Sequence, residues 1–445
     1  MLQHVERVVD LLDPALNAIH NMSIDEARGR VRSGDPAAVR GIDGSFALVA
    51  KDGVTVRLAR SLDRPMRYFL AKRQAGPALF VSDRIDTLHR ALAGEGLDEQ
   101  FHPSYTRMVP AHYVLELQLV GCPDPDPTYT RFVAPARATL PADLDDIGRR
   151  YVGALAGEIA KWLVSIDRGA SGAKEPIGVA FSGGIDSGAV LLVTYHTMQR
   201  TGLSPSRLKA FTLNLGGGQD LDQARTFLDR VGLSMFLEEI AATSADLDLA
   251  DTLRTLEDYK PLDVHCAAMG LLLSKGIRDR YPGWRYMIDG DGGDENLKDY
   301  PIEENTELTI RSVINNLMLY HEGWGVGRIK HSLTYSGGLS RGYVRTYAPG
   351  RRYGFDEFSP FTRPSVVEIA EGIPFAALTS YDEAALYSLK GEIVRRGVRA
   401  VTGIEMPVFA KRRFQDGVAS REKISALFEG DEKLYRKQFY ALYGG

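Results

Sequence analysis

Cysteine is nearly absent from this chain of 445 residues, which contains only Cys122 and Cys266. The two residues lie far apart and do not have a metal-ligand spacing, so we expect neither a disulfide framework nor a cysteine-based metal site. Two reduced thiols are typical of a cytoplasmic protein. No apolar run approaches the roughly 20 residues that cross a bilayer, and the N-terminal residues lack the basic-then-apolar order of a signal peptide.

The chain also lacks an excess of either charge, since 54 lysines and arginines stand against 58 aspartates and glutamates. Nucleic-acid-binding and membrane-surface proteins usually carry an excess of basic residues. We therefore expect a soluble, cytoplasmic protein whose partners include no nucleic acid and no membrane. The length and the 44% of hydrophobic residues are sufficient for two domains, each with its own core.

The first third of the chain is rich in strand signals. Gly44 to Ser61 contains two β-branched and aromatic runs around Asp52-Gly53, which predicts a hairpin. Further strands are expected near Phe80 and from Tyr113 to Val120. The proline-dense stretch GCPDPDP that follows is incompatible with a helix or a central strand. We place a domain boundary after it, near residue 140, which gives domains 1–140 and 141–445.

The second domain has a different pattern. It opens with apolar residues at helical spacing, from Ile147 to Trp162, and apolar runs then alternate with helical patterns. The expected strands are 177–181, 208–215 and 285–288, and the residues after about 305 are expected to be mostly helical. This alternation predicts an α/β fold, with a parallel sheet covered on both faces and ligands at the carboxyl ends of its strands.

The sequence FSGGIDSG, residues 181–188, follows one of these strands and opens a helix. Its two glycines permit a tight turn that exposes backbone N–H groups, and the helix N-terminus adds partial positive charge. Ser182 and Ser187 add hydroxyl donors, and Asp186 could hold Mg²⁺ on a polyphosphate. A plain strand–turn–helix connection is the alternative. The string lacks the Walker lysine and resembles the pyrophosphate loop of N-type ATP pyrophosphatases, which cleave ATP between the α and β phosphates.

A second glycine-rich loop, DGDGGDENLKDY, follows the strand at 285–288. Asp291, Asp294 and Glu295 crowd carboxylates that repel one another unless a cation neutralises them, so a Mg²⁺ site is expected. A solvated acidic loop or a Ca²⁺ loop is the alternative, although the spacing does not fit an EF-hand. The two loops, about 105 residues apart, are more specific together than separately.

Together these motifs resemble the synthetase domain of the asparagine synthetase family, whose second loop reads SGEGSDE. Residues 211–224 resemble the segment that carries part of the family's adenine pocket, and residues 358–374 resemble its "PFLD" segment. KRRFQDGV, residues 411–418, resembles "K-x-x-F-x-D-G-V". The resemblance implies that Lys411 meets the phosphates and the developing charge on the acyl group.

The first third resembles the family's glutaminase domain, a two-sheet sandwich of the Ntn type, through GIDGSFALVAKDG, ARSLDRPMRYFL, ALFVSDRIDTL and VPAHYVLEL. That domain works through an N-terminal cysteine, and no cysteine precedes Cys122 here, so we expect no glutamine hydrolysis by that route. The fold class implied is α/β: a degenerate glutaminase-like α+β sandwich, followed by an ATP pyrophosphatase domain, adenine nucleotide α-hydrolase-like, with a parallel sheet and a helical C-terminal part.

Without that cysteine, the chain resembles the β-lactam synthetase and carbapenam synthetase branch of the family. In that branch the amine belongs to the substrate itself. That branch has a tyrosine where this chain has Asp291, whereas asparagine synthetases have a glutamate there. His265 and Lys260 stand where asparagine synthetases usually have Arg and Asp, which argues against aspartate as the substrate. Glu322 lies roughly where the branch places its catalytic glutamate, and a helix-surface glutamate is the alternative reading.

The mechanism implied has two steps. Asp186 and Asp294 hold Mg²⁺ across the pyrophosphate while the substrate carboxylate attacks the α-phosphorus of ATP. An amine then attacks the acyl-adenylate, with Lys411 stabilising the oxyanion and Asp291, together with Glu322, accepting the amine proton. The residues expected to bind ATP and pyrophosphate are Ala180, Phe181, Ser182, Gly183, Gly184, Ile185, Asp186, Ser187, Leu213, Asn214, Gly290 and Lys411.

The expected function is AMP-forming amide synthesis on an amino-acid-like carboxylate, with β-lactam synthetase-like ring closure in antibiotic biosynthesis as the preferred interpretation. Ammonia- or amine-dependent amidation and lasso-type peptide cyclisation are alternatives, because only the binding cleft would differ. Sulfur transfer to tRNA fits poorly with two scattered cysteines and a near-neutral charge. A binding-only relative fits poorly with the two intact loops and Lys411. The oligomeric state stays open, with a homodimer as one option.

Overall fold

The computed structural model describes residues 7–73, 76–118, 127–167, 175–216, 219–299, 302, 309–315, 343–409, 428 and 430–444. Their contacts divide the chain into two compact units. The first extends to Ala134 and also takes in the C-terminal segment from Lys437, while the second extends from Pro135 to Arg436. The expected boundary near residue 140 thus lies a few residues after this division. The assignment of the C-terminal segment to the first unit has no counterpart in the sequence-based prediction.

The first unit contains two four-stranded sheets. The predicted hairpin is confirmed, because residues 47–52 and 55–60 pair antiparallel with Val49 opposite Leu58, and Gly53 at the turn has a φ of +57°. One sheet has the order β1 (Arg7–Asp10), β7 (Ala78–Ser82), β6 (Arg67–Ala71), β8 (Arg107–Met108), and the other has the order β10 (Thr128–Arg131), β9 (Tyr113–Gln118), β5 (Thr55–Arg60), β4 (Ala47–Asp52). Most neighbours are antiparallel, and β1 with β7 is a parallel pair.

Side chains from both sheets meet in one core, among them Leu58, Tyr68, Leu79 and Leu115, each fully buried. The C-terminal segment completes this unit, since the Tyr443 hydroxyl donates to Asp86 Oδ1 at 3.0 Å. The remaining elements are η1 (Pro14–Leu16), β2 (Ala18–Ile19), α1 (Ile24–Ser33), α2 (Pro36–Arg40), β3 (Gly44–Ser45), α3 (Ile85–Gly94), η2 (Asp98–Gln100) and η3 (Pro103–Tyr105), and α19 (Glu432–Ala441) ends in the C-terminal segment.

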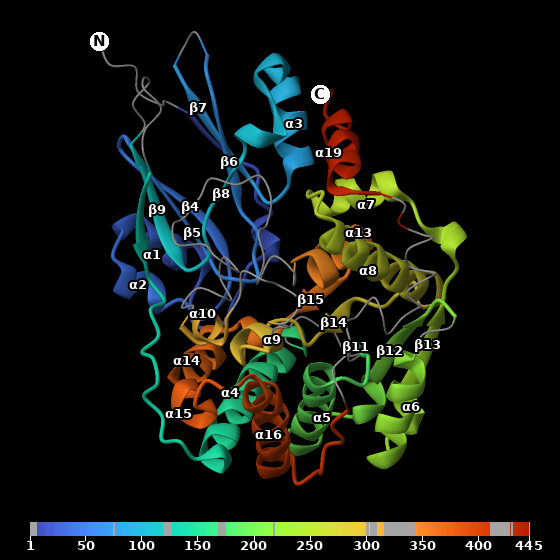
Figure 1. The fold of residues 1–445 in the computed structure, drawn as a ribbon. Coiled ribbons are helices and arrows are strands. Elements are labelled where there is room, and N and C mark those ends of the chain that lie inside the picture. Colours follow the sequence, from blue (N-terminus) through green and yellow to red (C-terminus); the bar gives the residue numbers. More distant parts are fainter. Residues whose placement is uncertain are drawn as a thin grey trace. The chain divides into compact units, whose positions relative to one another are not determined.

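The second unit is built on the parallel sheet that the alternating pattern predicts (Figure 1). Its five strands have the order β13 (Leu237–Ala241), β12 (Leu208–Asn214), β11 (Ile177–Ala180), β14 (Tyr286–Ile288), β15 (Asp356–Phe358), and all neighbours are parallel. The two edge strands are missing from the prediction. Both are short and carry two acidic residues each, and such charged edges obscure the apolar signal of a strand while protecting the sheet from further pairing.

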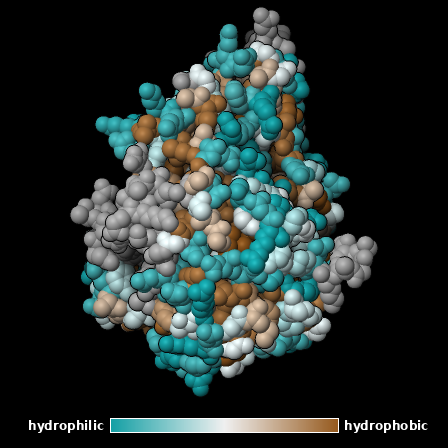
Figure 2. All heavy atoms as spheres, turned by 90° about the vertical axis from the view of Figure 1, so that its right-hand side faces the viewer, coloured by the Kyte–Doolittle hydropathy of each residue, from teal (hydrophilic) through white to brown (hydrophobic). Residues whose placement is uncertain are grey.

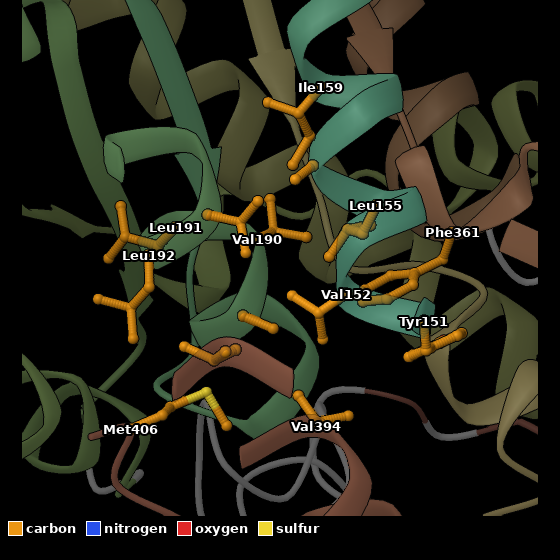
Figure 3. Close-up of a cluster of buried hydrophobic side chains, with 14 of the residues drawn as sticks. Tyr151, Val152, Leu155, Ile159, Val190, Leu191, Leu192, Phe361, Val394 and Met406 are labelled. Atoms are coloured by element: carbon orange, nitrogen blue, oxygen red, sulfur yellow. The ribbon is translucent and has the colours of Figure 1, made fainter. Parts of the chain in front are cut away.

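Helices cover both faces of this sheet. Ile177 and Val179 of β11 belong to a core that includes α4 (Leu144–Asp167), α5 (Ile185–Arg200) and α16 (Glu383–Thr402), shown in Figure 3. Phe211 and Leu213 of β12 belong to a second core with α8 (Pro261–Arg280). The other elements are η4 (Pro205–Arg207), α6 (Asp220–Arg230), η5 (Ser234–Phe236), η6 (Ser244–Asp246), α7 (Leu249–Leu256), α9 (Gly293–Asn296), α10 (Ile310–Asn315), the π-helical η8 (Tyr343–Tyr347), α13 (Ala348–Arg352), η9 (Pro360–Thr362), α14 (Pro364–Gly372) and α15 (Phe375–Thr379).

The predicted long helix that opens the second unit is α4, and it packs closely on α16. A Cβ atom on Gly148 would lie 2.6 Å from the carbonyl oxygen of Ile393, and one on Gly397 would lie 2.3 Å from the carbonyl oxygen of Gly148. Glycine at both positions therefore lets the two helix backbones touch. This contact holds α16 against α4, and α16 also packs on α5, whose first turn contains Asp186.

The surface seen in Figure 2 has hydrophilic residues around smaller hydrophobic areas. Among the helices that the structure describes, none combines the length and the apolar character needed to cross a membrane.

Candidate active site

The two predicted loops follow neighbouring strands. In chain order the sheet grows from β11 outward to β12 and β13, and then continues on the other side of β11 with β14 and β15. This reversal makes the β11–β14 pair the topological switch point, where parallel sheets of this kind bind ligands beyond the carboxyl ends of the strands. The loop at 182–184 leaves β11 and the loop at 289–292 leaves β14, so both open at this point.

Glycine is required in the first loop for a steric reason. Gly183 has a φ of +72°, and a Cβ atom there would lie 2.9 Å from the backbone nitrogen of Ala224 in α6. Gly184 is the N-cap residue of α5, and its amide donates to Ser182 Oγ at 3.3 Å. The hydroxyls of Ser182 and Ser187 lie 3.2 Å apart. Backbone N–H groups and hydroxyls therefore gather at the N-terminus of a 16-residue helix, an arrangement that binds phosphate.

The two loops touch each other through glycines of the second loop. A Cβ atom on Gly290 would lie 2.8 Å from the backbone nitrogen of Ser187, and one on Gly293 would lie 2.3 Å from Asp186 Oδ1. A side chain at residue 290 would displace the backbone of Asp186 and Ser187, and one at residue 293 would displace the Asp186 carboxylate. The glycines of the second loop thus bring Asp186 and the acidic residues of that loop together.

We expect Gly293→Ala to lower ATP-dependent activity by about tenfold or more, because the added methyl group must push the Asp186 carboxylate away and misplaced catalytic groups cost rate on this scale. Gly157→Ala is the matched control, since that glycine lies on an exposed part of α4 and a Cβ atom there meets nothing within 4 Å. The activity of both variants should be measured beside their thermal unfolding. Equal activity in the two variants would show that the loops are not closely packed.

A lysine that sequence reasoning missed lies between the two loops. Lys390 Nζ donates to Asp186 Oδ2 at 2.6 Å, and it also donates to Asp294 Oδ1. Asp299 Oδ2 lies 3.5 Å from the same ammonium, and the Lys390 side chain is 3% exposed. Burial by itself would lower the pKa of Lys390, but the three carboxylates hold that pKa well above its ordinary value.

Lys390 belongs to α16, where it lies among buried apolar residues. Leu386, Leu389 and Ile393 are buried on the same stripe of this helix. A lysine on the apolar stripe of an amphipathic helix is unusual, because Lys is almost never buried unless it is paired. That pattern was the signal that could have identified Lys390 from the sequence.

Asp186 and Asp294 fit a shared cation, because both already contact one ammonium group. Among the described residues no group of three or more His, Cys, Asp or Glu side chains could hold a metal ion. Two carboxylates suit Mg²⁺ in particular, which is commonly bound by one or two carboxylates and completes its shell with water and substrate phosphates. The donor set therefore fits Mg²⁺ bound together with a polyphosphate.

Asp291 lies beside this cation site. Thr346 Oγ1 donates to Asp291 Oδ2 at 3.0 Å, and Arg345 Nη1 lies 3.7 Å from Asp291 Oδ1. The Asp291 amide donates to Asp289 Oδ1 at 2.9 Å, and Ser359 Oγ donates to Asp289 Oδ2 at 2.9 Å. Burial raises the pKa of Asp291 to about 6, a value that suits a general base near neutral pH.

The residues expected at the adenine lie at the end of β12. Leu213 is 3% exposed and packs in the core with α8, so its backbone is the part that a ligand can reach. Asn214 Nδ2 donates to Glu239 Oε1 at 2.6 Å, and its Oδ1 accepts from the Gly216 amide at 2.8 Å. Ala180 ends β11, and Phe181 follows it with its amide bonded to the Phe211 carbonyl.

Two expected catalytic residues, Lys411 and Glu322, lie outside the residues that the structure describes. Their roles stay predictions from the resemblance.

Comparison with known protein families agrees with this geometry. Residues 168–343 match the family model described as asparagine synthase. Both loops lie within this range, together with strands β11 to β14. A comparison with curated proteins found no match.

The asparagine synthase domain is of the ATP pyrophosphatase type, and members of the family are AMP-forming, ATP-dependent ligases that typically use Mg²⁺. The match therefore suggests ATP-dependent amidation or ligation. With both loops inside the matched range, it supports the assignment of residues 168–343 to the asparagine synthetase family.

Proposed function

We propose that this protein is an ATP-dependent synthetase that activates a carboxylate as its acyl-adenylate and couples the acyl group to an amine. The observation that carries the proposal is the convergence of Asp186 and Asp294 on Lys390 at the switch point of the sheet. Two carboxylates and one ammonium, beside the glycine-rich loop at the N-terminus of α5, would provide both the metal ligands and the phosphate donors that the first step needs.

In the first step the substrate carboxylate attacks the α-phosphorus of ATP, and the bond to the β-phosphate oxygen breaks. Backbone N–H groups of residues 182–187 and the N-terminus of α5 hold the leaving pyrophosphate. Lys390 contributes a compact positive charge to the same anion. Mg²⁺ held by Asp186 and Asp294 would neutralise phosphate charge.

In the second step the amine attacks the acyl carbonyl, the new C–N bond forms and AMP leaves with the electrons of the broken C–O bond. Asp291 takes the amine proton, since a carboxyl group with a pKa of about 6 is mostly ionised at pH 7. Lys411 is proposed to stabilise the oxyanion, as the resemblance implies. Glu322 is proposed to assist Asp291 on the same basis.

We further propose an amino-acid-like substrate whose own amine closes a ring, as in β-lactam synthetases. The support is the resemblance of the first third to a glutaminase domain without a cysteine ahead of Cys122. Amidation with ammonia and peptide cyclisation would use the same two steps with a different amine.

The products of ATP cleavage test the proposal. We expect AMP and pyrophosphate, and no ADP, when the protein is incubated with Mg²⁺-ATP and a panel of α- and β-amino acids with and without ammonia. Chromatography of the nucleotides separates the two outcomes, and ADP as the main product would refute the mechanism.

Glutamine should not replace ammonia as the nitrogen donor. Glutamate release that keeps pace with AMP formation would refute the proposed lack of glutaminase activity.

A further inference from the structure

One turn of π-helix, η8, is held against helix α8. A Cβ atom on Gly270 of α8 would lie 2.2 Å from the backbone oxygen of Arg345 and 2.9 Å from Pro349. Only a glycine lets the turn approach so closely, and α13 continues the chain directly from it. Single π-helical turns are rare and occur frequently at functional sites. This packing places the side chains of Arg345 and Thr346 at the second loop of the site.

The turn supplies a partner to each oxygen of the Asp291 carboxylate. Thr346 Oγ1 donates to Oδ2 at 3.0 Å, and Arg345 Nη1 lies 3.7 Å from Oδ1. The hydrogen bond from Thr346 orients the carboxylate, and the guanidinium charge lies on the side of its other oxygen. The two partners come from consecutive residues, more than fifty positions along the chain from Asp291, so only the packing of η8 on α8 creates them.

The charges around Asp291 make Arg345 important. Asp289, Asp294 and Glu295 face it from its own loop and from α9, and Glu357 approaches from β15. Burial raises the pKa of Asp289 and of Glu357 well above their ordinary values, and the neighbouring carboxylates add to this effect. Burial raises the pKa of Asp291, and the positive charge of the Arg345 guanidinium offsets part of this rise. Arg345 thus favours the ionised form of Asp291 within a crowded acidic cluster.

We propose that Arg345 and Thr346 are positioning residues for Asp291: Arg345 pairs with one carboxylate oxygen, and Thr346 directs the other oxygen toward the amine. The proposal rests on the proposed function, in which Asp291 accepts the proton that leaves the attacking amine. A proton acceptor is effective only when it is ionised and aimed along the N–H bond. The two residues are assigned no contact with substrate.

Stability as a function of pH tests the Arg345–Asp291 pair without any substrate. When folding raises the pKa of an acidic group, the protein loses stability as the pH rises from the unfolded pKa of that group, about 4, through its folded pKa. For Asp291 this window extends to about pH 6, and Arg345→Met should extend it by about one pH unit. The difference in melting temperature between Arg345→Met and the wild type should therefore grow as the pH rises from 5 to 8.

The same substitution in an Asp291→Asn background is the control, because asparagine does not titrate. The extra pH dependence should disappear there, and Arg345→Lys in the wild-type background, which keeps the positive charge, should retain most of the wild-type pH dependence. If Arg345→Met changes the melting temperature with the same pH dependence in both backgrounds, Arg345 does not act on Asp291 and the proposal is wrong.

Kinetics test the role of Thr346. In Thr346→Val, the rate of hydroxamate formation from hydroxylamine, used as the probe amine, should fall at least tenfold more than the rate of pyrophosphate exchange. The acid limb of the pH–rate profile for hydroxamate formation should shift to higher pH by about one unit. Thr346→Ser retains the hydroxyl and should recover the profile. Equal losses in pyrophosphate exchange and in hydroxamate formation would indicate that Thr346 has a merely structural role. Absence of pyrophosphate exchange in the wild type would refute the proposed function instead, while the stability comparison would still decide the Arg345–Asp291 pair.

Discussion

Lys390→Met should lower pyrophosphate exchange by on the order of 10²–10³-fold, the loss that typically follows removal of one preorganised donor from a site of developing charge. The ammonium contacts Asp186 and Asp294 at once, which places it where two loops must meet an anionic polyphosphate. Without it, the carboxylates of Asp186, Asp294 and Asp299 lose the ammonium group that all three contact. Binding of ATP and approach of the substrate carboxylate would both be opposed by this negative charge.

The prediction separates a catalytic lysine from a structural one. Binding of Mg²⁺-pyrophosphate, measured by calorimetry, should weaken in Lys390→Met together with exchange. Lys390→Arg should recover little, because the planar guanidinium is larger than an ammonium and cannot occupy the same position among three carboxylates. Lys275→Met is the matched control, since Lys275 is 41% exposed and pairs with Asp246 and Asp279 on the surface. Unchanged pyrophosphate binding in a folded Lys390→Met variant would mean that Lys390 does not bind the anion and only reduces the repulsion among the three carboxylates.

A second large effect is expected in stability. Lys298→Met should lower the free energy of unfolding by about 3–5 kcal/mol, because it leaves Glu371 as a buried carboxylate without its main partner. Lys298 Nζ donates to Glu371 Oε1 at 2.6 Å, and both side chains are 1% exposed. Arg137 is a more distant partner, at 3.5 Å from Glu371 Oε2. Its guanidinium offsets part of the loss but cannot reach both carboxylate oxygens as closely.

Guanidinium denaturation of three variants measures this effect. The double variant Lys298→Met/Glu371→Leu should recover most of the stability, since a buried ion pair replaced by apolar residues of similar volume is often neutral or better. Arg395→Ala serves as the control, because it breaks an exposed pair with Glu405 and should cost at most about 1 kcal/mol. If the double variant is no more stable than Lys298→Met, the loss arises from the αL backbone of residue 298 and not from the unpaired acid.

This buried pair also bears on the site, because Lys298 directly precedes Asp299, whose carboxylate lies 3.5 Å from the Lys390 ammonium. Anchoring Lys298 to α14 holds the end of the second loop in place. The stability of the loop and the geometry of the cation site therefore depend on the same contact. Variants of Lys298 that remain folded are expected to show weaker Mg²⁺-pyrophosphate binding.

The two loops and their order along a parallel sheet could be predicted from the sequence. Paired glycines after an apolar run and before a helical pattern signal a tight turn at a helix N-terminus, whatever the rest of the chain does. Asp186 and Asp294 stand within these strings, so their placement at the switch point of the sheet also follows from local pattern. The hairpin at residues 47–60 is equally local, because two adjacent strands and one glycine turn specify it.

Tertiary structure alone decided which distant side chains meet these loops. Lys390 is 96 residues from Asp294, and Thr346 is 55 residues from Asp291, so no spacing rule connects them. The edge strands β13 and β15 form because the sheet offers them a partner, since their own apolar signal is too weak to specify a strand. Local sequence determines turns and helix starts through backbone sterics, whereas ion pairs and the pKa of Asp291 depend on packing of α16 and η8, whose positions are fixed by glycine contacts with α4 and α8.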